Sequence, residues 1–171
     1  GLGVKMADPA REVYVMVGDG SYLMMAQEIV TSIQEGFKIT IVLCDSRGFA
    51  SIGGLSRSIG SQGFGTDYRY RDRQSGGLSG EYLPVDLAAN AESLGALVHR
   101  AADRASLERG LEAARAADRT MIIYVPVDPL KGVPGYDCWW DVPVAEVSEQ
   151  ADVRRARKNW EEGKKRQRYF L

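Results

Sequence analysis

The chain has 171 residues and a formal net charge of −1, and 44% of its residues are hydrophobic while 26% are charged. This is the composition of an ordinary soluble globular domain, so it favours neither a disordered nor a fibrous protein. The near-zero charge provides no long-range attraction for nucleic acid or an anionic membrane. The longest apolar runs, such as ITIVLC at 39–44, are strand-sized and far below the ~20 residues that a membrane helix needs. We therefore expect neither nucleic acid nor a membrane among the partners.

The two cysteines, Cys44 and Cys138, have no metal-binding or redox spacing. No signal-peptide pattern opens the sequence, so we expect a cytoplasmic protein. The opening GLGVKMA has helical composition without a cap, which predicts that the chain is a fragment of something longer.

The first 45 residues predict a strand, a helix and a second strand. EVYVMV at 12–17 is apolar on both faces, which favours a central strand of a parallel sheet. Over 21–35, apolar residues recur at spacings of three and four, which predicts one amphipathic helix that ends at Gly36. KITIVLC at 38–44 is a second buried strand, so the segment predicts a right-handed strand–helix–strand unit.

The segment 47–81 is rich in glycine and serine and is either a flexible linker or a long binding loop. Its interspersed apolar residues favour a loop that packs on the protein, with one short helix within 50–60. The remaining patterns predict, in chain order, a helix at 85–96, an edge strand at 96–101, a helix at 106–118 and a strand at 120–127.

These elements together predict an α/β domain over residues 1–147, doubly wound, with a mainly parallel sheet and helices on both faces. A charged helical tail follows at 148–171. The basic run of this tail is better explained as a solvated helix face than as a nucleic-acid site, since the whole chain is balanced in charge.

The sequence Gly18–Asp19–Gly20 lies where the first strand ends and the helical pattern begins. In open parallel sheets, ligands bind at this edge, where the helix N-termini favour anions. Leu23 replaces the third glycine of a dinucleotide fingerprint, so that motif is excluded. Backbone donors at Gly20 and Ser21 suit a phosphate, yet Asp19 would repel it.

A divalent cation resolves this conflict, because Mg²⁺ commonly joins protein carboxylates to a diphosphate. A second ligand should follow the second strand, because parallel strands bring their carboxyl ends to one edge; the residues there are Asp45, Ser46, Arg47 and Gly48. The alternative is that Asp19 only caps the helix, which aspartate does well.

GDG followed, after a helix and a strand, by a short polar motif resembles the diphosphate-binding motif of thiamine diphosphate enzymes. The resemblance implies that Asp19, Ser46 and the backbone carbonyl of Gly48 hold Mg²⁺. It also implies that thiamine diphosphate is bound by Gly18, Asp19, Gly20, Ser21, Ser46, Gly48 and Phe49. Ser46 departs from the family pattern, which usually has asparagine there; a hydroxyl can ligate Mg²⁺ or hold a ligating water, but its reach is shorter.

Longer stretches, including SIGGLSRSIGSQGFGT, VDLAANAESLGA and KKRQRYFL, resemble the C-terminal domain of the trihydroxycyclohexane-dione hydrolases of myo-inositol catabolism. That resemblance implies the thiamine diphosphate-binding fold and a homo-oligomeric enzyme of three domains. It further implies hydrolysis of a C–C bond in a cyclic 1,2-diketone to give 5-deoxy-glucuronate. The activating glutamate would come from a pyrimidine-binding domain of the same or a neighbouring subunit, so no catalytic residue is expected in this chain. An acetolactate synthase-like carboligase and a non-catalytic module without metal binding remain the alternatives.

Overall fold

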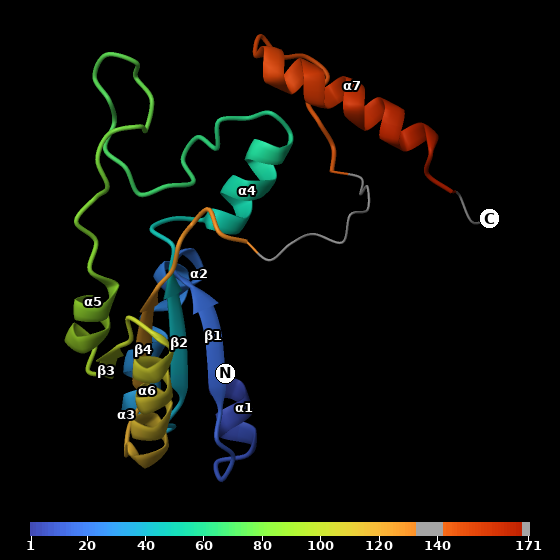
Figure 1. Ribbon diagram of the computed structural model, residues 1–171. Helices are drawn as coiled ribbons and strands as arrows, with labels where there is room; N and C mark the ends of the chain where they lie inside the picture. Colours follow the sequence, from blue (N-terminus) through green and yellow to red (C-terminus); the bar gives the residue numbers. More distant parts are fainter. Residues whose placement is uncertain (133–141, 169–171) are drawn as a thin grey trace. The chain divides into compact units, whose positions relative to one another are not determined.

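The computed structural model describes residues 1–132 and 142–168, so Cys138 and the end of the predicted tail, 169–171, lie outside it (Figure 1). The chain divides into two compact units. The first consists of residues 1–49 and 83–128, and the second of residues 50–82 and the chain from 129 onward. Each unit is described by itself.

The first unit is built on a parallel sheet of four strands in the order β1-β2-β4-β3. The strands are β1 (Tyr14–Gly18), β2 (Thr40–Asp45), β3 (Leu97–Arg100) and β4 (Met121–Pro126). Gly18 is in register with Cys44 of β2. The residues that follow β1 and β2 therefore start from the same edge of the sheet, as expected from the sequence.

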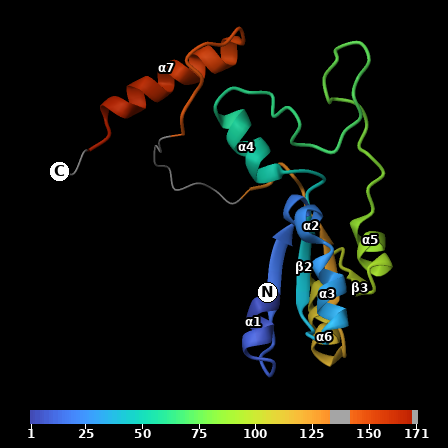
Figure 2. The same cartoon turned by 180° about the vertical axis from the view of Figure 1, so that it is seen from behind.

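Helices cover both faces of this sheet, which confirms the doubly wound α/β class (Figures 1 and 2). One face carries α2 (Asp19–Met25), α3 (Glu28–Gln34) and α5 (Leu87–Ser93), and the other carries α6 (Arg104–Ala116). The first core joins Tyr22, Ile29, Leu87 and Ala91 of the helices to Ile41, Leu43 and Ile122 of the strands. The second joins Leu107, Leu111 and Ala114 of α6 to Val42, Met121 and Ile123.

The predicted helix over 21–35 is wrong in one respect, because the structure has two short helices there. At their junction, the amides of Ile29 and Val30 donate to the carbonyls three residues earlier, at Ala26 and Gln27. This tighter turn interrupts the i to i−4 ladder and ends α2 at Met25. Gly36 ends the helical segment as predicted, in the left-handed region with φ of 68°.

The prediction that the first strand is central is also wrong for the described sheet, where β1 lies at an edge. Its side chains are correspondingly accessible, and Met16 is 77% exposed. The apolar pattern of EVYVMV indicates that both faces of this strand are hydrophobic. It does not indicate how many strands pair with it.

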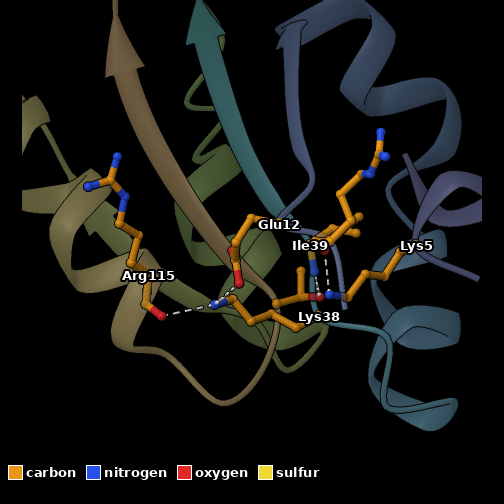
Figure 3. Close-up of polar contacts among 7 residues, drawn as sticks. Lys5, Glu12, Lys38, Ile39 and Arg115 are labelled. Carbon is orange, nitrogen blue, oxygen red and sulfur yellow. Dashed lines mark hydrogen bonds and ion pairs between the residues drawn. The ribbon is translucent and has the colours of Figure 1, made fainter. Parts of the chain in front are cut away.

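Polar contacts tie the other end of the first unit together (Figure 3). Helix α1 (Leu2–Ala7) carries the buried Lys5, whose ammonium donates to the carbonyl of Arg11 at 2.6 Å. The Lys38 ammonium lies 3.4 Å from the carboxylate of Glu12 and 3.2 Å from the carbonyl of Arg115. The segment leading into β2 is thus fastened to the end of α6 and to the segment that leads into β1.

The second unit contains α4 (Ala50–Ser58) and α7 (Ala151–Lys165), so the short helix expected within 50–60 and the helix of the tail are both confirmed. Gly60, with φ of 85°, packs closely on the first turn of α7: a β-carbon there would lie 2.4 Å from the carbonyl oxygen of Asp152. The guanidinium carbon of Arg69 lies 3.8 Å from the centre of the Tyr82 ring. The segment after β2 is therefore a packed loop rather than a free linker. Over the described ranges, 1–132 and 142–168, no helix has the length and apolarity needed to cross a bilayer.

Candidate functional site

Asp19 is the first residue of α2, directly after β1, and its side chain is buried with 2% exposure. One carboxylate oxygen accepts a hydrogen bond from the backbone amide of Gly20 at 2.9 Å. The other accepts from the amide of Gly48, 29 residues later, at 2.7 Å. Gly18, rather than Asp19, occupies the cap position of the helix. The carboxylate therefore links the end of β1 to the loop after β2.

Ser46 and Gly48 meet Asp19 as the sequence predicts. The Ser46 hydroxyl lies 3.3 and 3.4 Å from the two carboxylate oxygens of Asp19 and 3.2 Å from the carbonyl oxygen of Gly48. A hydroxyl has one proton and can donate to one acceptor at a time. Three electron-rich groups therefore converge with a single proton among them.

Electrostatics make this cluster costly for the chain alone. Burial raises the pKa of Asp19 above its ordinary value, the Gly48 amide partly offsets the rise, and the neighbouring Asp45 carboxylate raises it again. Burial and the charge of Asp19 also raise the pKa of the Cys44 thiol. A cation among these oxygens would compensate both the burial and the repulsion.

The oxygens present fit Mg²⁺, which prefers carboxylate, carbonyl and hydroxyl or water oxygens and does not need nitrogen or sulfur ligands. Over the described residues, no group of three or more histidine, cysteine, aspartate or glutamate side chains is placed to hold a metal. The candidate set is instead mixed, with the Asp19 carboxylate, the Ser46 hydroxyl and the Gly48 carbonyl.

The two glycines that flank Asp19 behave differently. A β-carbon at Gly20 would lie 2.4 Å from the ring of Phe49, so glycine is required there for Phe49 to pack on α2. A β-carbon at Gly18 would meet nothing within 4 Å, and its φ of −82° suits any residue. The fold thus explains Gly20 and leaves open space beside Gly18.

Ser21 is exposed and lines an apolar cavity of about 470 Å³ that α1 and α2 border.

Asp45, which the sequence offered only as one of four candidates for a second metal ligand, has a different role in the structure. One of its oxygens accepts from the amide of Arg47 at 2.8 Å, and the other accepts from the Tyr124 hydroxyl at 2.6 Å. Arg47 has φ of 58°, a left-handed conformation that is uncommon outside glycine. The carboxylate holds this turn, which directs Ser46 and Gly48 toward Asp19. Burial and the bond to Asp45 raise the pKa of Tyr124 to about 12. The sequence signal that could have revealed this role is an aspartate at the end of a strand, because aspartate side chains often accept a hydrogen bond from the backbone amide two residues later in a turn.

Comparisons with known proteins agree with this geometry. The chain is 40% identical over 159 residues to a 3D-(3,5/4)-trihydroxycyclohexane-1,2-dione hydrolase of Clostridium botulinum, covering 93% of this chain and 25% of the relative. It is 41% identical over 155 residues to a protein of Bacillus cereus named 3D-(3,5/4)-trihydroxycyclohexane-1,2-dione hydrolase 2, covering 91% of this chain and 24% of that protein. The chain thus spans about a quarter of the length of these curated relatives.

Solved structures support the fold. The chain resembles a thiamine diphosphate-dependent 4-hydroxybenzoylformate decarboxylase of Rhodococcus jostii RHA1 with a TM-score of 0.57 and 20% identity, over 74% of this chain and 22% of that one. A benzoylformate decarboxylase of Polynucleobacter necessarius gives the same TM-score, with 21% identity over 75% and 22% of the two chains. The family model described as "Thiamine pyrophosphate enzyme, C-terminal TPP binding domain" matches residues 1–125. The chain therefore belongs to the thiamine pyrophosphate enzyme family, as a C-terminal domain of the kind that binds this cofactor.

Proposed function

We propose that this chain holds the diphosphate of thiamine diphosphate through Mg²⁺, and that it is the C-terminal part of a longer enzyme. Residues 1–147 form the cofactor-binding domain in this proposal, and residues 148–171 form its helical tail. The 40% identity to trihydroxycyclohexane-dione hydrolases supports the same reaction for the whole enzyme. That reaction opens the cyclic 1,2-diketone by hydrolysis of a C–C bond, to 5-deoxy-glucuronate, in myo-inositol degradation in the cytoplasm.

The observation that carries the proposal is the convergence of Asp19, Ser46 and Gly48 at the ends of two adjacent parallel strands. The Asp19 carboxylate, the Ser46 hydroxyl and the Gly48 carbonyl would hold Mg²⁺. The diphosphate would occupy the open space beside Gly18, where the protein itself has no need of a glycine. Phe49, packed on Gly20, and Ser21 would border the cofactor.

The bound cofactor supplies a nucleophilic carbon and an electron sink for cleavage of a C–C bond next to a carbonyl. The contribution of this chain is to position that cofactor through rigid, buried contacts. Asp19 is held by two backbone amides, and Asp45 holds the turn that carries Ser46 and Gly48. The glutamate that activates the cofactor belongs, in this proposal, to a pyrimidine-binding domain of the same or a neighbouring subunit of a homo-oligomer. The isolated chain accordingly binds cofactor weakly and turns over no substrate.

A non-catalytic module is the competing function, and Ser46 favours it because the family usually has asparagine at this position. A hydroxyl nevertheless places an oxygen within 3.4 Å of both Asp19 oxygens in this structure. The shorter side chain therefore still reaches the cluster. An acetolactate synthase-like carboligase would use the same cofactor site, so activity on the diketone distinguishes it.

Calorimetry with thiamine diphosphate tests the proposal, on this chain and on the whole enzyme with its pyrimidine-binding domain. We expect binding that requires Mg²⁺ and is abolished by a chelator. Ser46→Asn should retain this binding, whereas Ser46→Ala, which removes the oxygen, should weaken Mg²⁺ affinity by about 10-fold or more. Binding that is equally strong without Mg²⁺, or no binding even in the whole enzyme, would contradict the proposal and favour the non-catalytic module.

A further inference from the structure

The second unit contains a cavity of about 430 Å³ that none of the proposed cofactor residues lines. It lies among the C-terminal end of α4, the segment 142–144 and α7. Its walls combine apolar and polar side chains, among them Ile59, Val144 and Trp160 together with Arg57, Arg155 and Asn159. A volume of this size, with apolar walls and a few polar groups, is typical of sites for small molecules.

The guanidinium of Arg57 lies against two glycines. A β-carbon at Gly53 would lie 3.1 Å from each terminal nitrogen of the Arg57 guanidinium, and one at Gly63 would lie 3.0 Å from one of these nitrogens. Gly63 is also in the left-handed region, with φ of 69°. The guanidinium thus lies against backbone at two points where any side chain would displace it. The absence of side chains at Gly53 and Gly63 therefore leaves room for the charged group at this position.

The charge of Arg57 is not compensated by the part of the chain that the structure describes, where no carboxylate forms an ion pair with it. Arg155, by contrast, is paired with Asp152 at 2.6 Å. Arg57, Arg155 and Asp152 give the cavity a formal charge of +1. A guanidinium is a planar fork of donors that matches the two oxygens of a carboxylate or phosphate.

Trp160 provides a rigid apolar wall. Its ring is contacted by Arg157, whose guanidinium carbon lies 4.6 Å from the ring centre, and by Lys164, whose ammonium lies 4.8 Å from it. Arg157 is itself fixed by Glu161 at 2.8 Å and by the carbonyl of Val144 at 2.9 Å. These contacts hold the indole beside the cavity before any ligand arrives.

We propose that the cavity between α4 and α7 binds a small organic oxyanion, with its carboxylate or phosphate on Arg57 and its carbon body against Trp160, Ile59 and Val144. Asn159 is placed on the same wall to bond a hydroxyl or carbonyl of that body. The site goes beyond the proposed cofactor function, since neither Asp19 nor Ser46 belongs to it.

Three hexoses that differ in one group test the ligand class: glucose, glucuronate and glucose 6-phosphate, titrated into the chain by calorimetry. We expect at least one of the two anions to bind, and glucose to bind at least about 10-fold more weakly. The anion that binds identifies the carboxylate or the phosphate as the preferred group. Equal binding of glucose and the anions, or no binding of any of the three, would overturn the proposal.

Two neighbouring glycines of α4 offer a matched pair of variants for the role of Arg57. Gly53→Ala places a methyl group 2.8 Å from the Thr66 hydroxyl and 3.1 Å from the Arg57 guanidinium, so both side chains must shift, whereas Gly54→Ala meets nothing within 4 Å. We expect Gly53→Ala to weaken anion binding by about 10-fold and Gly54→Ala to change it less than twofold. Arg57→Gln removes the charge and leaves Gly53 and Thr66 unchanged, and it should also weaken anion binding by about 10-fold. Circular dichroism checks that each variant is folded. Equal anion binding by all three variants would refute the assignment of Arg57. We expect none of the three variants to change Mg²⁺ binding at Asp19.

Discussion

Asp19 and Asp86 both lie where a helix begins, but the protein shifts their acidities in opposite directions. Asp86 caps α5, is about half exposed and accepts from the amide of Ala89 at 2.9 Å, and its pKa is lowered chiefly by that hydrogen bond. Asp19 is almost fully buried, and its pKa is raised chiefly by that burial. Both accept backbone amides, so hydrogen bonding does not explain the difference.

The difference comes from what surrounds each carboxylate. Asp86 faces solvent and the guanidinium of Arg100, 3.1 Å away, whereas Asp19 faces a second carboxylate, Asp45, and two further oxygens. Asp86 therefore stabilises the fold in its charged form, while ionised Asp19 opposes it. A buried carboxylate that costs stability and is still held by two amides is what the proposed cation site requires, and a stabilising cap does not require it.

Asp19→Asn gives the largest effect. An asparagine side chain has one acceptor oxygen, so it can accept from only one of the Gly20 and Gly48 amides, which now bond to different oxygens. It also lacks the charge that attracts a cation, so we expect Mg²⁺-dependent binding of thiamine diphosphate to fall by about 100-fold or more. Without Mg²⁺ the variant should unfold close to the temperature of the parent, because the removal of a buried, uncompensated charge offsets the loss of one hydrogen bond. Calorimetry measures the affinity, and thermal unfolding with and without Mg²⁺ measures the stability.

The pH dependence sharpens this prediction. The folded pKa of Asp19 lies above the unfolded one, so its carboxylate lowers stability as the pH rises through the folded value. Binding of a cation needs the ionised form, so Mg²⁺ affinity should rise over the same pH interval and release protons. An Asp19→Asn variant that keeps its affinity, or that melts well below the parent without Mg²⁺, would place Asp19 in the same class as Asp86.

Asp45→Ala should give an intermediate effect. It leaves the Arg47 amide and the Tyr124 hydroxyl without their acceptor, which costs about 2 kcal/mol of unfolding free energy. Because the turn through Arg47 then loses its support, Mg²⁺ affinity should fall by about 10-fold. The free energy follows from urea unfolding and the affinity from calorimetry.

Tyr124→Phe is the control for Asp45, since it removes one hydrogen bond and leaves the contact of Asp45 with Arg47. We expect a loss of about 1 kcal/mol and little change in Mg²⁺ affinity. Equal effects of the two variants on the metal would show that Asp45 acts through Tyr124 and not through the turn.

Parallel topology alone predicted that residues 45–48 lie beside Asp19, and the resemblance to thiamine diphosphate enzymes selected Ser46 and Gly48 among them. Gly18 and Asp45 are fixed at one edge once β1 and β2 are adjacent, and the spacing of apolar residues was enough to find both strands. The same reasoning could not find the role of Asp45. Its partners are an amide in a left-handed turn and a hydroxyl from β4, 79 residues away, and neither follows from periodicity.

Two elements show where local patterns fail. The break after Met25 depends on a single tightened turn, and the spacing of Tyr22 and Ile29 is compatible with one helix or two. The place of β1 at an edge depends on which strands pair with it, which is a property of the whole sheet. Element types were therefore predictable, while breaks and neighbours were not.

Asp86→Ala, which changes the exposed carboxylate rather than the buried one, should give the smallest effect. Loss of the cap costs about 1 kcal/mol of unfolding free energy at pH 7. Because the folded pKa of Asp86 is below the unfolded value near 3.8, its contribution is present above that value and is lost as the pH falls through the folded one. Urea unfolding between pH 7 and about pH 3 should show the gap between parent and variant closing with acid. A gap that stays constant down to the lowest pH would mean that α5 gains nothing from the charge of Asp86, and that the contrast with Asp19 is one of burial alone.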